Sequence, residues 1–203
     1  MDDSEREQAL LTALTTEHFV LQTSRGVTVA ESTGRATIFL SMLSAALIGL
    51  GFVSSSGDLL KPFLGAVLPT LIVTGLLTYL RLVQTMVENS LDLRRIQSIR
   101  AYYHRRFAGE HDFFADAVMG EGTTMEAAWA AVGSRPGRTQ LLLTTAALVG
   151  AVNALLVGLG VTLLTAMAAD SATLAVAVGV VVALAVFGAQ FAYINHRSVS
   201  LRR

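Results

Sequence analysis

The chain has 203 residues, of which 53% are hydrophobic and only 15% are charged. Soluble domains carry about 25% charged residues, so this composition excludes most soluble classes and predicts an integral membrane protein. The 15 basic and 15 acidic residues cancel, so no basic field argues for a nucleic-acid partner. The absence of cysteine excludes disulfides, iron–sulfur clusters and thiol catalysis.

Four apolar segments are long enough to cross a bilayer, which takes about 20 residues. They occupy residues 36–53, 62–80, 140–168 and 172–193, and none contains an ionisable Asp, Glu, Lys, Arg or His. The acidic start MDDSERE is unlike the basic start of a signal peptide, so we expect the first segment to be a retained span. The sequence predicts an all-α membrane protein with four transmembrane helices arranged as two hairpins.

The basic residues predict the orientation of these spans. Fourteen arginines lie before the first span, between spans two and three, or after the fourth, whereas the two other loops hold only Lys61. Because cytoplasmic loops carry an excess of Lys and Arg, we expect both termini and the central region to be cytoplasmic. We expect the membrane to be a bacterial-type inner membrane.

The regions outside the spans have helical patterns. Ser4 and Glu7 have the spacing of a capping box, and Leu10, Leu14 and Leu21 follow at helical intervals. We expect this N-terminal helix to run antiparallel to an extension of the second span, which meets no Gly or Pro before Gly109. The predicted regions are 1–35 (amphipathic, cytoplasmic), 36–80 (hairpin 1), 81–138 (cytoplasmic helical connector), 139–195 (hairpin 2) and 196–203 (basic tail).

Aromatic residues near the predicted membrane boundaries are expected to act as interfacial anchors. Trp and Tyr are enriched at membrane–water interfaces. Residues 113–118 resemble a short helix, and residues 123–132 a second one that carries the single Trp. The expected anchors are Trp129, Tyr79 and Tyr193.

A basic cluster follows the second span. Clusters of this size immediately inside a span are suited to lipid phosphate. A plain orientation signal on a solvated helix face is the interpretation that we favour over lipid contact. The candidates for anionic-lipid contact are Arg94, Arg95, Arg100, Arg105 and Arg106.

Few polar residues lie inside the spans. Thr70, Thr74 and Thr78 recur every four residues beside Pro69, and Asn153 lies in the third span. A threonine face of this kind either lines a pore or returns hydrogen bonds to its own helix backbone, and an intramembrane Asn often links helices. We therefore consider these four residues as either pore-lining or packing residues.

Small residues at four-residue spacing predict close helix packing, within one chain or between copies. We expect a homo-oligomer. The packing candidates are Ser41, Ala45 and Gly49 in the first span and Gly150 and Ala154 in the third.

No catalytic, metal or cofactor signature is present. His104 and His111 lie near Asp112 and Asp116, but no compact metal motif joins them and Gly109 interrupts the helix between them. We therefore predict no metal, no cofactor and no enzymatic activity. The interpretation that fits best is a self-associating membrane scaffold or regulator with a cytoplasmic protein partner. The alternatives are an oligomeric pore lined by the threonine face and, less favoured, an enzyme acting at lipid headgroups.

Overall fold

The computed structural model describes residues 2–55, 57–109, 111–117, 141–168 and 171–200. Within these ranges the chain forms no strand. It forms helices α1 (Asp3–Val53), α2 (Gly57–Phe107), α5 (Thr145–Ala168) and α6 (Ala172–Ser200), and a 3₁₀ turn η1 (Ala115–Ala117). All four α-helices are long and apolar enough to cross a membrane, which confirms the predicted four-span all-α class and indicates a multi-pass membrane protein.

Helices α1 and α2 are much longer than a membrane span. Each has 51 residues, a contour length of about 77 Å at 1.5 Å per residue, against about 30 Å of hydrocarbon. The predicted extension of the second span is confirmed, because α2 continues to Phe107 and Gly109 then adopts φ +56. That left-handed conformation is readily available to glycine and ends helices.

The first turn of α1 is capped differently from the prediction. The Ser4–Glu7 capping box is wrong: Asp2 lies at the helix start, its N–H donates to Glu5 Oε2 at 2.9 Å, and its own Oδ1 accepts from the Asp3 N–H at 2.7 Å. Glu7 lies one turn further on and contacts another helix. The physical reason is that a carboxylate caps as well as a hydroxyl, and Asp2 is positioned to do so.

Helices α5 and α6 begin at hydroxyl caps. Thr144 Oγ1 accepts from the Ala147 N–H at 3.2 Å, so α5 begins at Thr145, five residues later than the predicted span. Ser171 Oγ accepts from the Leu174 N–H at 3.4 Å at the start of α6. Both are N-cap arrangements, in which a side-chain oxygen satisfies a free backbone donor.

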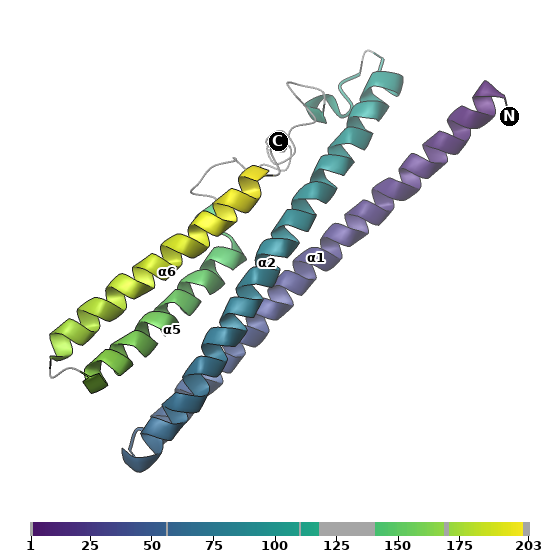
Figure 1. Ribbon diagram of the computed structural model, residues 1–203. Helices are drawn as coiled ribbons and strands as arrows, with labels where there is room; N and C mark the ends of the chain where they lie inside the picture. Colours follow the sequence, from purple (N-terminus) through teal and green to yellow (C-terminus); the bar gives the residue numbers. More distant parts are fainter. Residues whose placement is uncertain (1, 56, 110, 118–140, 169–170, 201–203) are drawn as a thin grey trace. The chain divides into compact units, whose positions relative to one another are not determined.

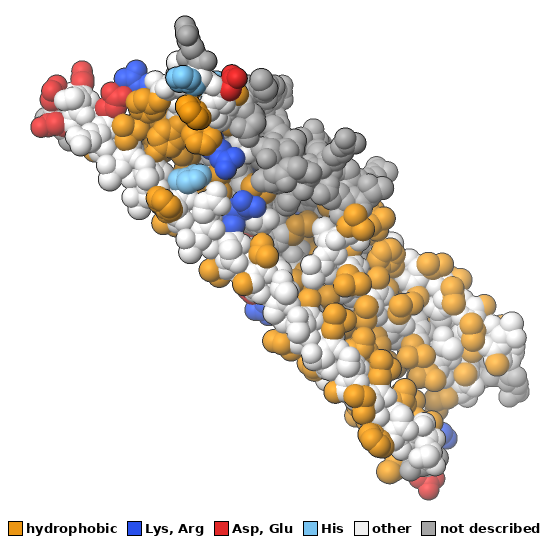
Figure 2. Space-filling model, turned by 180° about the vertical axis from the view of Figure 1, so that it is seen from behind, with side chains coloured by type: hydrophobic (Ala, Val, Ile, Leu, Met, Phe, Trp, Pro, Cys, Tyr) orange, Lys and Arg blue, Asp and Glu red, His pale blue; other side chains and the backbone are white. Residues whose placement is uncertain are grey.

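The chain divides into two compact units. Unit 1 comprises Met1–Glu31, Thr85–Gln140 and Ser198–Arg203, and unit 2 comprises Ser32–Gln84 and Leu141–Arg197. In the face that Figure 2 shows, hydrophobic side chains spread over unit 2, whereas the acidic and histidine side chains in view lie mainly on unit 1. The four uncharged apolar segments of the sequence thus fall largely in unit 2.

Within unit 2, α5 is the central helix and lies between α2 and α6 (Figure 1). One third of its most apolar stretch is buried, a larger share than in the other three helices. Glycines bring α5 close to both neighbours: Gly158 lies against α6, and Gly160 lies against Leu68 and Ile72 of α2. Small residues permit such contacts because no side chain separates the backbones.

Candidate functional site

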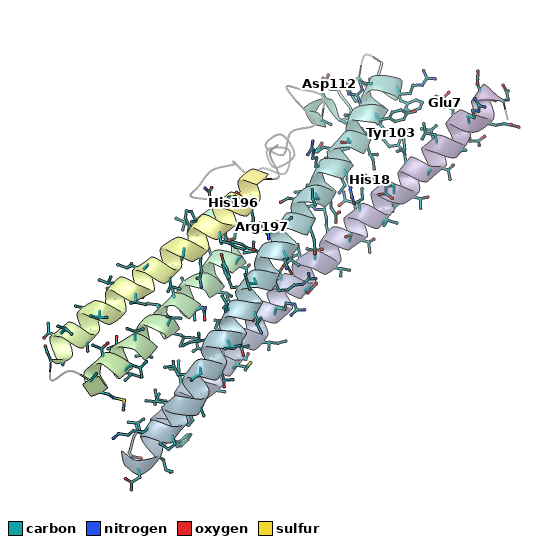
Figure 3. The ribbon with its side chains drawn as sticks, viewed as in Figure 1. Glu7, His18, Tyr103, Asp112, His196 and Arg197 are labelled. Carbon is teal, nitrogen blue, oxygen red and sulfur yellow. The ribbon has the colours of Figure 1, made fainter. Side chains whose placement is uncertain are left out.

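Side-chain hydrogen bonds between described residues of α1 and α2 within unit 1 define an antiparallel pair. As the α1 number in each contact rises, the α2 number falls, which is the antiparallel arrangement predicted from sequence. Figure 3 shows two of these residues, Glu7 and Tyr103, on the facing helices. The contacts are Glu7–Arg106, Thr15–Tyr103, Ser24–Asp92 and Arg25–Asn89.

The outermost contact is a two-point ion pair. Arg106 Nε and Nη2 donate to the two carboxylate oxygens of Glu7 at 2.8 and 3.0 Å. The hydrogen bond from Arg106 lowers the pKa of Glu7, and the same bond raises the pKa of Arg106. Both groups are exposed, so the pair fixes the helix register more than it stabilises the unit.

An apolar layer follows. Leu21 packs with Ile96 and Ile99, all of them buried, and Leu14 and Tyr103 pack against this group. The Tyr103 hydroxyl lies 3.0 Å from Thr15 Oγ1, which satisfies its polar end. This layer is thus an apolar contact between α1 and α2, with polar contacts on either side of it along the helices.

A polar layer lies beyond it. Asp92 is 8% exposed, and one of its carboxylate oxygens accepts from Ser24 Oγ at 2.8 Å. Arg25 Nε donates to Asn89 Oδ1 at 3.0 Å. The pKa of Arg25 is lowered, mainly because burial penalises its charge, while Asp92 opposes this shift and Arg100 adds to it. Charged groups are therefore partly desolvated between the two helices.

Three buried polar atoms of unit 1 have no hydrogen-bond partner among the described residues. They are His18 Nδ1, Gln97 Oε1 and Arg100 Nε. Figure 3 shows His18 on the α1 side of the helix pair. Buried polar groups are usually satisfied, so three such atoms in one stretch of structure need an explanation.

The five arginines predicted to contact anionic lipid have different environments. Arg106 is held by Glu7, Arg95 lies 3.9 Å from Asp92, and the Arg100 guanidinium lies over the Phe114 ring, 5.9 Å from its centroid. Arg94 and Arg105 are exposed. The five arginines therefore do not form one uniformly exposed basic face.

The predicted threonine face is divided between exposed and half-buried positions. Thr70 is exposed, whereas Thr74 and Thr78 are half-buried. Thr70 Oγ1 donates to the Ala66 carbonyl at 2.8 Å, one residue beyond the carbonyl that Pro69 leaves without its helical partner. The Thr70 hydroxyl is thus directed to its own helix.

Two amide side chains of unit 2, those of Asn153 and Gln190, are buried in its helix contacts. Asn153 is 2% exposed, and its Oδ1 lies 2.6 Å from where a Cβ on Gly75 would be. Gln190 Oε1 likewise lies 2.9 Å from where a Cβ atom on Gly150 would be. The Tyr79 hydroxyl donates to the Gln190 backbone carbonyl at 2.5 Å, so this predicted anchor is a buried link between α2 and α6, whereas Tyr193 is exposed.

The predicted small-residue faces differ in their surroundings. On α1, Ser41 and Ala45 are exposed, while a Cβ on Gly49 would lie 3.0 Å from the Phe63 ring. On α5, Gly150 and Ala154 are both buried within unit 2.

The described residues include no group of three His, Cys, Asp or Glu side chains placed to hold a metal ion. His104 Nδ1 lies 2.6 Å from the Phe113 carbonyl, a contact that fastens the turn after α2. The predicted helix over 113–118 contains the short η1, and Trp129 lies outside the described residues.

Sequence reasoning missed the close backbone contact between Gly158 of α5 and Gly179 of α6. The available signal was a glycine in the middle of each of two successive spans. Sequence alone does not show which glycine of a span faces which neighbour.

Comparison with protein-family models, with curated proteins and with solved structures finds no match to this chain. The geometry of the two units is therefore the basis for a functional proposal.

Proposed function

We propose that the protein is a non-catalytic membrane scaffold or regulator that associates with itself and uses unit 1 as a cytoplasmic interaction surface. The proposal places it in a bacterial-type inner membrane as two hairpins, with both termini and unit 1 on the cytoplasmic side. The distribution of basic residues, fourteen against one, supports this orientation.

The observation that carries the proposal is the exposure of large apolar side chains on unit 1. Phe19 is 67% exposed, Val27 62% and Phe113 67%. These residues lie outside the uncharged spans, so lipid does not account for their exposure. Apolar surface of this kind on a water-facing unit favours contact with another protein surface.

Self-association is tested by native mass spectrometry of the full chain in nanodiscs. We expect oligomers for the wild type, and at least a tenfold shift toward monomer for the Phe19→Ser/Val27→Ser double variant. Gln8→Ser, at an exposed polar position of α1, is the matched control and should leave the distribution unchanged. A monomeric wild type would contradict the proposal, as would steady bilayer conductance altered by Thr74→Leu, which would favour the pore.

Orientation is tested by single-cysteine labelling, which is clean because the natural chain has no cysteine. Ser55→Cys lies in the short connection between α1 and α2, and Ser98→Cys lies on the exposed face of α2 in unit 1. A membrane-impermeant maleimide should label Ser55→Cys in spheroplasts and Ser98→Cys only after lysis. The reverse pattern would invert the topology.

A further inference from the structure

We propose that α1 of unit 1 pairs with the same helix of a second copy of this chain, the two helices lying parallel and in register about a two-fold axis. This inference rests on the proposed self-association, and it names the surface and the geometry of the contact. The surface, called the α1 outer face below, consists of six exposed residues: Ala13, Thr16, Val20, Thr23, Val27 and Ala30.

The α1 outer face lies on the side of the helix away from α2. Leu14 and Leu21 pack in the apolar layer against α2. Nine residues, or two and a half helical turns, separate Leu14 from Thr23 and Leu21 from Ala30, so the outer residues lie on the opposite side. The six residues follow one another at intervals of three, four, three, four and three. This alternation is the heptad spacing of helices that pair along their whole length.

The α1 outer face contains no charged residue. Between Gln8 and Ala30 the only Asp, Glu, Lys or Arg residues are Glu17 and Arg25, and Arg25 donates to Asn89 of α2. Soluble domains carry about 25% charged residues, so this stretch is far poorer in charge than an ordinary water-facing helix. Its composition is that of a helix covered on both sides.

The hydroxyl groups on this face do not require a polar partner. Thr16 Oγ1 donates to the Thr12 carbonyl and Thr23 Oγ1 to the Phe19 carbonyl, each at 2.9 Å. Such bonds return the hydroxyl to its own helix backbone. Between these threonines lie the apolar side chains of Val20, 57% exposed, and Val27, 62% exposed. The face therefore suits an apolar helix surface as its partner.

A second copy meets the requirements of this face in a parallel arrangement. The membrane gives every copy the same orientation, so two α1 helices meet parallel, and a two-fold axis sets each residue against its equivalent. Val20 and Val27 then take the a positions of the heptads, where β-branched residues favour two-stranded pairs. Glu17 takes position e, and the two e positions lie on opposite sides of a parallel contact, so the two carboxylates do not meet.

The part of α1 in unit 2 also favours a second copy over a soluble partner. It continues the alternating spacing with small or apolar residues that permit close helix packing in a membrane. A soluble protein would reach the face in unit 1 only, whereas the α1 helix of a second copy has matching residues in both units. The exposed residues in unit 2 are Gly34, Thr37, Ser41, Ser44 and Ile48.

The first test is disulfide formation between single-cysteine variants in native membranes, oxidised with copper phenanthroline. A disulfide requires Cβ atoms about 3.5–4.5 Å apart, which a parallel pair in register provides at each position of the face. We expect Thr16→Cys, Val20→Cys, Thr23→Cys and Val27→Cys all to give covalent dimers. Val29→Cys is the matched control, because Val29 is 56% exposed and lies on the opposite side of the helix from Val20. It should give at least tenfold less dimer.

The second test exchanges charges at one position of the face. Val20→Glu and Val20→Lys should each reduce the dimer at least tenfold when expressed alone, because each sets two like charges against each other. Two differently tagged copies, one with each substitution, should recover the dimer when expressed together. Native mass spectrometry measures all three, and Val29→Glu should leave the wild-type distribution unchanged.

The outcomes separate this contact from self-association in general. Wild-type oligomers that none of the Val20 variants changes would overturn the α1 contact and leave self-association standing, whereas a monomeric wild type would contradict both. A disulfide at one position of the face only would indicate antiparallel helices and overturn the parallel pair. Equal dimer yield from Val29→Cys would assign the disulfides to random collision and overturn the contact.

Discussion

Gly158 of α5 and Gly179 of α6 approach so closely that the carbonyl oxygen of each lies 2.7 Å from where a Cβ atom would stand on the other. The two backbones therefore touch reciprocally, and each Cα–H faces a carbonyl oxygen. Thr162 lies in the same contact, where its hydroxyl donates to the Gly158 carbonyl at 2.9 Å. Lipid provides no hydrophobic force between helices, so close packing of this kind holds α5 to α6.

Gly158→Ala should weaken this helix pair. The added methyl would meet the Gly179 carbonyl and the Ala183 Cβ, each 2.7 Å away, and backbone atoms cannot rotate aside. We expect a loss of about 1–3 kcal/mol in the free energy of unfolding, as for other overpacked interiors. Titration of dodecylmaltoside micelles with sodium dodecyl sulfate, followed by circular dichroism, measures this loss.

The matched control for that variant is Gly188→Ala on α6. A Cβ there has no neighbouring atom within 4 Å, so only the higher helix propensity of Ala acts. Its stability should stay the same or rise slightly. If both variants lost the same free energy of unfolding, the loss in Gly158→Ala could not be assigned to the Gly158–Gly179 contact.

Tyr79→Phe should destabilise unit 2 more than Tyr193→Phe. The Tyr79 hydroxyl is buried and donates to the Gln190 carbonyl, whereas the exposed Tyr193 hydroxyl accepts a 3.2 Å bond from Arg197 on its own helix. Interhelical hydrogen bonds in membranes contribute about 0.6 kcal/mol on average. The same detergent titration compares the two variants, and an equal or larger loss for Tyr193→Phe would contradict the structure.

The four helices were predictable because hydropathy acts over a whole segment. A run of 18 or more uncharged apolar residues has few alternatives to a spanning helix, whatever its neighbours. The end of α2 was also predictable, because Gly109 is the first glycine after Arg81, and it adopts a positive φ. Pairwise contacts such as Gly158–Gly179 depend instead on how the helices are rotated about their axes.

The candidate site was only partly visible in the sequence. The arginines after the second span were recognised as a cluster, but their partners were not: Glu7 contacts Arg106, 99 residues away, and Ser24 contacts Asp92, 68 residues away. The spacing of Ser4 and Glu7 predicted a capping role for Glu7, because sequence patterns relate only residues that are close together in the chain. Such long-range pairings appear only when two helices have a defined register.

Leu21→Ala should open the apolar layer of unit 1. Leu21 is 3% exposed and packs with Ile96 and Ile99, so its truncation leaves a cavity beside them. Core substitutions of this type cost about 2–5 kcal/mol. Hydrogen exchange of residues 14–25 and 92–103 should become much faster, whereas Val20→Ala, at a position 57% exposed, should leave it nearly unchanged. Protection that survives Leu21→Ala would mean that the polar layers alone hold the helices together.

The Glu7–Arg106 pair should make the outer end of unit 1 sensitive to acid. The hydrogen bond from Arg106 lowers the pKa of Glu7 below its ordinary value of 4.5, so the folded form is favoured while the carboxylate is ionised. This contribution is complete above the ordinary pKa and is lost as the pH falls through the lowered one. Hydrogen exchange of residues 5–12, corrected for the intrinsic rate at each pH, should be slower in the wild type than in Glu7→Gln at pH 7. The difference should shrink as the pH falls below 4.5, and it should also shrink in high salt, since both groups are exposed. A difference that does not change with pH would assign the protection to packing instead of to the ion pair.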